Sequence, residues 1–113
     1  MKPTKMHVPQ NLGALRDLLS MILLSAPKFL DETGYFPYRD LDYVFQQLLA
    51  GLSHNRAALG QERHHQMMKM ADRMRTLFEA DPDVKTGDTA QGYKIIHEME
   101  DILTEIRRKS RHG

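Results

Sequence analysis

The stretch LDYVFQQLLAGL, residues 41–52, decides the fold class of this chain. Apolar residues recur along it at intervals of three and four. Because an α-helix completes a turn every 3.6 residues, this spacing places the apolar side chains on one face of a helix. Such a face packs against other helices to form a core, and by itself it predicts no chemistry. The residues of the face are Leu41, Val44, Phe45, Leu48, Leu49 and Leu52.

Three further segments show the same period, so the sequence predicts four helices. The first begins near the N-cap Asn11, and Pro27 predicts a bend or break in it. The third covers about 61–80 and ends at Asp81-Pro82-Asp83, and the fourth begins at Asp88 or Thr89. Their apolar faces are Leu12, Leu15, Leu19 and Ile22 in the first, His64, Met67, Ala71, Met74 and Phe78 in the third, and Tyr93, Ile96, Met99, Leu103 and Ile106 in the fourth.

The sequence leaves the end of the second helix open. Small and polar residues between Gly51 and Asn55 favour a turn soon after Leu52. The alternative is a helix that continues to Leu59 and stops at Gly60, because glycine commonly ends helices.

We expect one all-α domain over residues 1–113, folded as a four-helix up-down antiparallel bundle, because short connections favour antiparallel neighbours. Residues 1–10 are expected to form a loose N-terminal arm, and residues 107–113 a basic, frayed tail. The absence of cysteine excludes disulfides and thiolate zinc sites and is compatible with a cytoplasmic location. The longest apolar run, Met21–Leu24, is too short to cross a membrane.

The formal net charge is only +1, but the two ends of the predicted bundle differ in charge. In an up-down topology, residues 28–42 and 79–88 meet at one end, and residues 1–10, 54–65 and 105–113 meet at the other. The first end has more acids than bases: Asp31, Glu32, Asp40, Asp42, Glu79, Asp81, Asp83 and Asp88 against Lys28, Arg39 and Lys85. The second end has the reverse: Lys2, Lys5, Arg56, Arg63, Arg107, Arg108, Lys109 and Arg111 against Glu62 and Glu105.

The acidic end also carries an aromatic connection, and aromatic rings among charges favour protein binding. We therefore predict a partner-binding patch at this end. The alternative is that the rings cover the open end of the core and the acids are only solvated. The residues of the predicted patch are Tyr35, Phe36, Tyr38, Asp40, Asp81, Asp83 and Asp88.

Two sets of residues leave enzymatic or relay alternatives open. His54 lies in a segment that faintly resembles histidine phosphotransfer bundles, although the lysine and glycine that follow the histidine there are missing here. Glu98, Asp101 and Glu105 share a helix face, as magnesium-binding carboxylates do in all-helical nucleotide pyrophosphohydrolases, but no acidic pair faces them in the middle of the second helix. Without that second pair we expect no metal site and no cofactor.

Two further groups of residues favour ordinary roles. His64 and His65 are adjacent and point in different directions on a helix, so we expect one at the core edge and the other in solvent. The basic tail has no aromatic residues among its charges, so we expect no nucleic-acid partner.

The order of the later segments resembles a known family. The run from Leu41 to Leu49 is followed by a turn, by a helix ending Ala71-Asp72-Arg73-Met74-Arg75-Thr76-Leu77-Phe78-Glu79-Ala80-Asp81-Pro82-Asp83, and by a capped helix with Tyr93. This order resembles small helical immunity proteins that neutralise type VI secretion effectors, in particular NAD(P)-hydrolysing toxins. In that family the corresponding helix ends Phe-x-x-x-Asp-Pro, and the spacing here, from Phe78 to Pro82, is one residue shorter.

The resemblance implies a bacterial cytoplasmic protein that is not an enzyme and that binds a cognate toxin, occluding its active site. A toxin that binds a phosphate-bearing dinucleotide is expected to have a positive cleft, which an acidic bundle end would complement. A generic helical adaptor that uses the same patch is a further alternative. The methionine-rich third helix is also compatible with self-association through a second copy of the chain.

Overall fold

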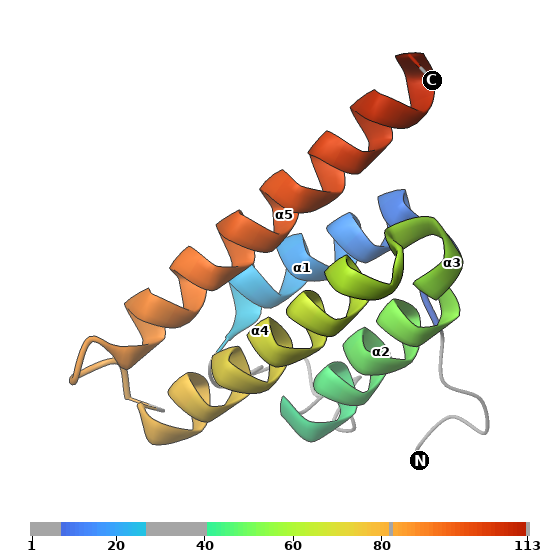
Figure 1. Ribbon diagram of the computed structural model, residues 1–113. Coiled ribbons are helices and arrows are strands. Elements are labelled where there is room, and N and C mark those ends of the chain that lie inside the picture. The colour runs from blue at the N-terminus through green and yellow to red at the C-terminus, as the bar shows by residue number, and fades with distance from the viewer. Residues whose placement is uncertain (1–7, 27–40, 82, 113) are drawn as a thin grey trace.

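The computed structural model describes residues 8–26, 41–81 and 83–112, the last three of these by their backbone alone. This part of the chain contains five α-helices and no strand (Figure 1). None of these helices is long and apolar enough to cross a bilayer. The helices are α1 (Leu12–Ser25), α2 (Leu41–His54), α3 (Arg56–Leu59), α4 (Gln61–Ala80) and α5 (Asp88–His112).

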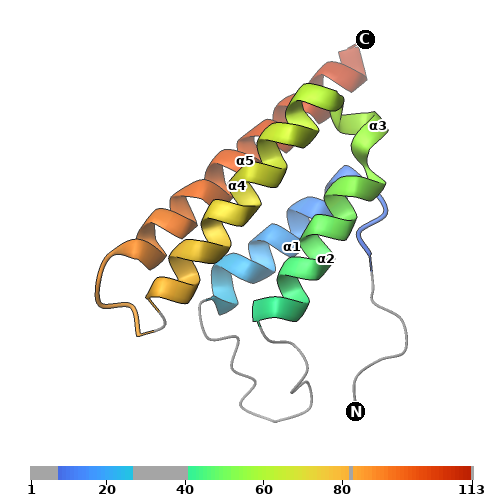
Figure 2. The same cartoon turned by 60° about the horizontal axis from the view of Figure 1, so that its bottom comes forward.

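The four longer helices form the predicted up-down bundle. α1 packs against α2 and α5, and α4 packs against the other sides of α2 and α5. The single turn of α3 joins α2 to α4 at one end of the bundle, and the 81–88 loop joins α4 to α5 at the other (Figure 2). The last turns of α5 extend past the neighbouring helices (Figures 1 and 2).

The first helix begins and ends for local reasons. The Asn11 side chain accepts a hydrogen bond from the backbone N–H of Ala14 at 2.8 Å, which confirms the predicted N-cap. Ala26, which precedes Pro27, has the extended backbone expected of a residue before proline, with ψ 153°. The helix therefore ends at Ser25, before the predicted break. Residues 27–40 lie outside the described residues, and so does any continuation of the helix there.

The end of α2 combines parts of both predicted alternatives. The helix passes through Gly51 and Ser53 to His54, and it breaks at Asn55. The buried side chain of Asn55 donates hydrogen bonds to the carbonyls of Gly51 (2.8 Å) and Pro9 (3.1 Å). Gly51 is needed here for space, because a Cβ at this position would lie 2.9 Å from the Pro9 ring.

Both predicted terminal segments have described parts. In the expected arm over residues 1–10, Pro9 is buried against α2 and its carbonyl accepts a hydrogen bond from Asn55. In the expected tail over 107–113, α5 continues as a helix to His112. Glu105 and Lys109, spaced as i and i+4, form an ion pair at 3.2 Å that supports these turns.

The predicted apolar faces meet in one core, which aromatic rings close near the 81–88 loop. Phe78 of α4 stacks at an angle against Phe45 and Tyr93. The Tyr93 hydroxyl donates a hydrogen bond to the Ala26 carbonyl at 2.8 Å, which ties α5 to the end of α1. The fully buried large side chains are Phe45, Phe78, Leu15, Leu19, Ile22, Leu48, Leu52, Met67, Met74, Ile96, Met99 and Leu103.

Candidate functional site

The 81–88 loop is organised by one buried carboxylate, that of Asp81, which is only 2% exposed. One oxygen accepts hydrogen bonds from the backbone N–H groups of Lys85 (2.6 Å) and Thr86 (3.1 Å). The other accepts from the N–H of Thr89 at 3.1 Å, in the first turn of α5. The Thr89 hydroxyl donates to the Asp81 carbonyl at 2.9 Å. The side chain of Asp81 therefore joins the end of α4 to Lys85, to Thr86 and to the first turn of α5.

The surroundings of Asp81 also set its charge. Burial alone would raise the pKa of its carboxyl, but the hydrogen bonds from Lys85, Thr89 and Thr86 outweigh burial and lower the pKa to about 2. Asp81 is thus ionised at neutral pH. Because its carboxylate is buried and already bonded, its predicted role as a partner contact is corrected: Asp81 shapes the loop that other residues present.

Val84 is the unusual residue of this loop. Its φ is 56°, in the left-handed region that β-branched residues rarely adopt, and its side chain is 57% exposed. Its N–H donates to the Asp81 carbonyl at 3.2 Å. A left-handed conformation costs a residue with a Cβ about 1–2 kcal/mol. The chain therefore holds a mostly exposed apolar side chain at a conformational cost.

A second exposed apolar side chain lies at the same end of the bundle. Leu24, in the last turn of α1, is 86% exposed, and within the described ranges it and Val84 are the large hydrophobic residues with exposed side chains. The C-terminal end of α1 and the 81–88 loop lie at one end of the molecule (Figure 2). We call the surface formed by Leu24, Asp83, Val84, Lys85 and Asp88 the loop end.

The acidic end of the bundle carries less negative charge than the sequence count suggested. Arg75 of α4 forms ion pairs with Asp42 of α2 and with Glu79, the latter at 2.8 Å, so its one positive charge offsets half of the charge of two counted acids. Asp83 is exposed and Asp88 partly exposed, and Asp88 accepts a hydrogen bond from the Thr86 hydroxyl at 3.0 Å. Tyr35, Phe36, Tyr38 and Asp40 lie outside the described residues, as do Asp31 and Glu32.

The residues of the enzymatic alternatives do not converge. Glu98 and Asp101 are exposed on α5, whereas Glu105 is held by Lys109 and, at 3.5 Å, by Arg63. The hydrogen bond from Lys109 and the charges of Lys109 and Arg63 lower the pKa of Glu105. Within residues 8–26, 41–81 and 83–109, no three His, Asp or Glu side chains are placed to hold a metal ion.

The histidines also occupy ordinary positions. His54 is exposed at the C-terminal end of α2 and is followed by the buried Asn55. His64 is partly buried and His65 exposed, as predicted, and Nε2 of His64 has no hydrogen-bond partner in the described part of the chain. Phosphorelay chemistry requires an accessible histidine, and the exposed position of His54 meets that requirement, as do those of His65 and His97.

A Ser, a Glu and a His do meet on the seam between α1 and α5, but in the wrong order for nucleophilic catalysis. The Ser20 hydroxyl donates to Glu100 at 3.2 Å, and Nδ1 of His97 lies 3.3 Å from the other Glu100 oxygen. A catalytic triad needs the hydroxyl to face the imidazole, with the carboxylate behind it. Here the carboxylate lies between the other two, so Ser20 has no base to activate it.

In comparisons with protein-family models, curated proteins and solved structures, nothing matches this chain. Its function is therefore argued from its own residues. The feature that sequence reasoning missed is Val84, because a valine in a left-handed conformation has no signature in the sequence. The only local signal was the short run Asp81-Pro82-Asp83, which marks a tight turn but does not show which residue takes the positive φ.

Proposed function

We propose that this chain is a cytoplasmic immunity protein that binds a cognate secreted bacterial toxin and blocks its active site with the loop end. The observation that carries the proposal is Val84, an exposed apolar residue in a left-handed backbone conformation. Strained residues of this kind cluster where a chain contacts ligands or partners. An inhibitor needs such a contact and needs no reacting group of its own.

The order of the loop supports this role physically. A loop that becomes ordered only on binding loses conformational entropy at that moment, which weakens the complex. The 81–88 loop is held beforehand by the Asp81 carboxylate and by the reciprocal bonds with Thr89. Val84 is therefore presented at a fixed position on a bundle whose core is fully packed.

The charges beside Val84 suit the class of toxin that the sequence resemblance implies. An NAD(P) glycohydrolase binds the phosphates of its substrate, so its cleft is expected to be positive. The carboxylates of Asp83 and Asp88 flank Val84 along the chain and are exposed or partly exposed. In the proposed complex the valine and Leu24 make the apolar contact, and the two acids face the basic groups of the cleft.

Co-expression tests the proposal. The toxin encoded beside the gene is produced in a heterologous bacterium together with the wild-type chain or with the double variant Asp83→Lys, Val84→Asn. We expect the wild-type chain to restore growth and the double variant to fail. Asp101→Lys is the matched control, because Asp101 is an exposed acid of α5 outside the loop end. This substitution raises the net charge of the chain by the same amount as Asp83→Lys. Protection by the double variant equal to that of the control would refute the loop end as the binding surface.

A further inference from the structure

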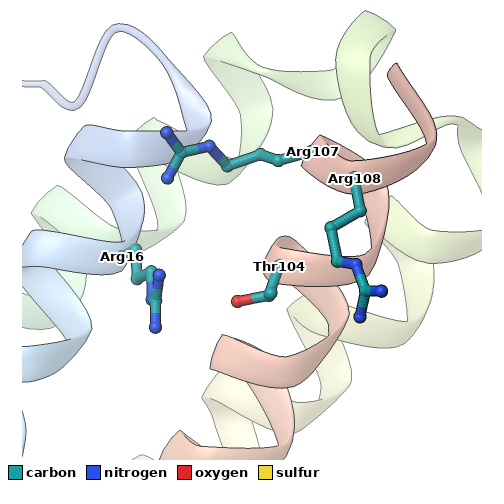
Figure 3. A pocket seen from close by; sticks show the side chains of 4 residues that line it. All are labelled: Arg16, Thr104, Arg107 and Arg108. Carbon is teal, nitrogen blue, oxygen red and sulfur yellow. The ribbon is translucent and has the colours of Figure 1, made fainter. Parts of the chain in front are cut away.

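We infer that a hollow between α1 and α5, separate from the loop end, is a binding site for a small phosphate-bearing ligand. The hollow has a volume of about 250 Å³ and is open to solvent. It is lined by Arg16 of α1 and by Thr104, Arg107 and Arg108 of α5 (Figure 3). Arg107 and Arg108 were expected in a basic tail, whereas Arg16 and Thr104 had no predicted role.

The register of the two antiparallel helices brings these residues together. The Ser20 hydroxyl of α1 donates a hydrogen bond to Glu100 of α5. Arg16 lies one turn before Ser20 in α1, and Thr104 lies one turn after Glu100 in α5, so in antiparallel helices the two are on the same side of this hydrogen bond. Figure 3 shows the Thr104 hydroxyl on the side of α5 that faces Arg16, with the Arg107 side chain reaching toward α1. Arg107 reaches Gly13 of α1, because a Cβ at that position would be in ordinary van der Waals contact with Nη1 of Arg107, at 3.8 Å. Arg16 and Arg107 thus extend from two helices beside one space, whereas the Arg108 guanidinium lies on the side of Thr104 that is away from Arg16.

The charges of the hollow are not neutralised within the described part of the chain. No carboxylate there lies within 4.0 Å of the side chains of Arg16, Arg107 or Arg108, whereas Arg63 binds one carboxylate and Arg75 binds two. Guanidinium groups gathered without a counter-ion repel one another and raise the local positive potential. An anion that binds between them relieves this repulsion, so the hollow favours a ligand with more than one negative charge.

The donor groups specify phosphate. The planar fork of arginine matches the oxygens of a phosphate group bidentately, and the Thr104 hydroxyl offers one further donor. No aromatic ring lines the hollow, so it offers no stacking surface for a nucleobase. The ligand class is therefore a diphosphate or a nucleoside polyphosphate recognised through its phosphates.

A small ligand fits the distribution of charge better than a nucleic acid does. Further along α5, Lys109 is paired with Glu105, and Glu105 also binds Arg63 of α4. These pairs interrupt the positive surface beside the hollow. The unneutralised charge is thus local and concave, whereas a nucleic-acid backbone needs basic groups along a continuous path.

Titration of the full chain with inorganic pyrophosphate at low salt tests this inference, with isothermal calorimetry as the readout. We expect saturable binding to the wild-type chain and an affinity at least about tenfold weaker for the double variant Arg16→Gln, Arg107→Gln. The matched control is Arg56→Gln, Arg73→Gln, which removes two exposed arginines from α3 and α4 and should bind like the wild type. All four positions are exposed, so circular dichroism should show the same helix content throughout.

Three results would overturn the site. The first is no saturable binding of pyrophosphate to the wild-type chain. The second is equal weakening by the two double variants, which would show a general charge effect. The third is tighter binding of a short DNA duplex than of pyrophosphate, which would assign the hollow to nucleic acid. Binding of ADP with the affinity of pyrophosphate, lost in the Arg16, Arg107 variant, would extend the site to nucleotides.

Discussion

Asp81 and Thr89 bind each other twice across the 81–88 loop. The Asp81 carboxylate accepts the backbone N–H of Thr89, and the Thr89 hydroxyl donates to the Asp81 carbonyl. The same pair therefore ends α4, caps the first turn of α5 and closes the loop that carries Val84. We therefore expect this pair of residues to affect both the stability of the bundle and the proposed binding surface.

Replacing Asp81 with alanine should destabilise the whole bundle. Three backbone N–H groups would lose their acceptor: that of Thr89 in a buried position and those of Lys85 and Thr86 in partly buried ones. We expect the melting temperature, followed by circular dichroism, to fall by about 5 °C or more. Lys85→Ala, which removes an exposed side chain from the same loop and keeps its backbone N–H, is the control and should change it little. An unchanged melting temperature for Asp81→Ala would show that the carboxylate does not hold the loop.

Acid should weaken the fold partly through this carboxyl group. Its pKa is about 2 in the folded chain, below the ordinary value of 3.8. Ionised Asp81 therefore contributes stability that is present above pH 3.8 and is lost as the pH falls toward 2. Chemical denaturation at several pH values should show this loss in the wild type and a shallower dependence in Asp81→Ala. Parallel curves for the two proteins between pH 4 and pH 2 would contradict the assignment.

Val84→Asn should stabilise the chain while weakening partner binding. Asparagine adopts positive φ more readily than valine, so relief of strain should raise the free energy of unfolding by about 1 kcal/mol. The same change removes an exposed apolar side chain from the loop end. Urea denaturation measures the first effect and toxin binding the second. A variant that is both less stable and fully active would disprove the view that this strain serves binding.

Gly92→Ala should destabilise the contact between α4 and α5. A Cβ at this buried position would lie 2.5 Å from the Phe78 ring, which is itself held between Phe45 and Tyr93. Overpacking of this kind costs about 1–3 kcal/mol, which exceeds the gain of about 1 kcal/mol in helix propensity from glycine to alanine. Gln91→Ala, exposed and one residue earlier in α5, is the control. Equal denaturation midpoints for the two variants would show that the ring can move aside.

The fold was predictable because apolar spacing needs no knowledge of the partner helix. The faces that contain Leu15, Phe45, Met74 and Ile96 are buried as expected, and Asn11 caps α1. The sequence could not show which polar groups turn inward. Pro9 packs against α2 because Gly51 leaves space there, and that proximity depends on how two helices cross.

The charge of the surface was predicted less well, because it also depends on how the helices pack against one another. Counting acids treated Asp42, Glu79 and Asp81 alike, but Arg75 forms ion pairs with the first two and the loop backbone binds the third. Arg16 joins Arg107 only through the register between α1 and α5. Interactions between residues far apart in the chain thus decide which charges a partner meets.

Inhibition of the purified toxin tests the central claim most directly. The rate of NAD hydrolysis by the toxin encoded beside the gene is measured with increasing amounts of the wild-type chain, of Asp83→Lys, Val84→Asn and of Asp101→Lys. If the loop end blocks the active site, the wild-type chain and the Asp101 variant should both inhibit the toxin fully near equimolar amounts. The loop variant should inhibit it little, although that variant stays folded. Equal inhibition by all three proteins would contradict the claim that the loop end blocks the toxin.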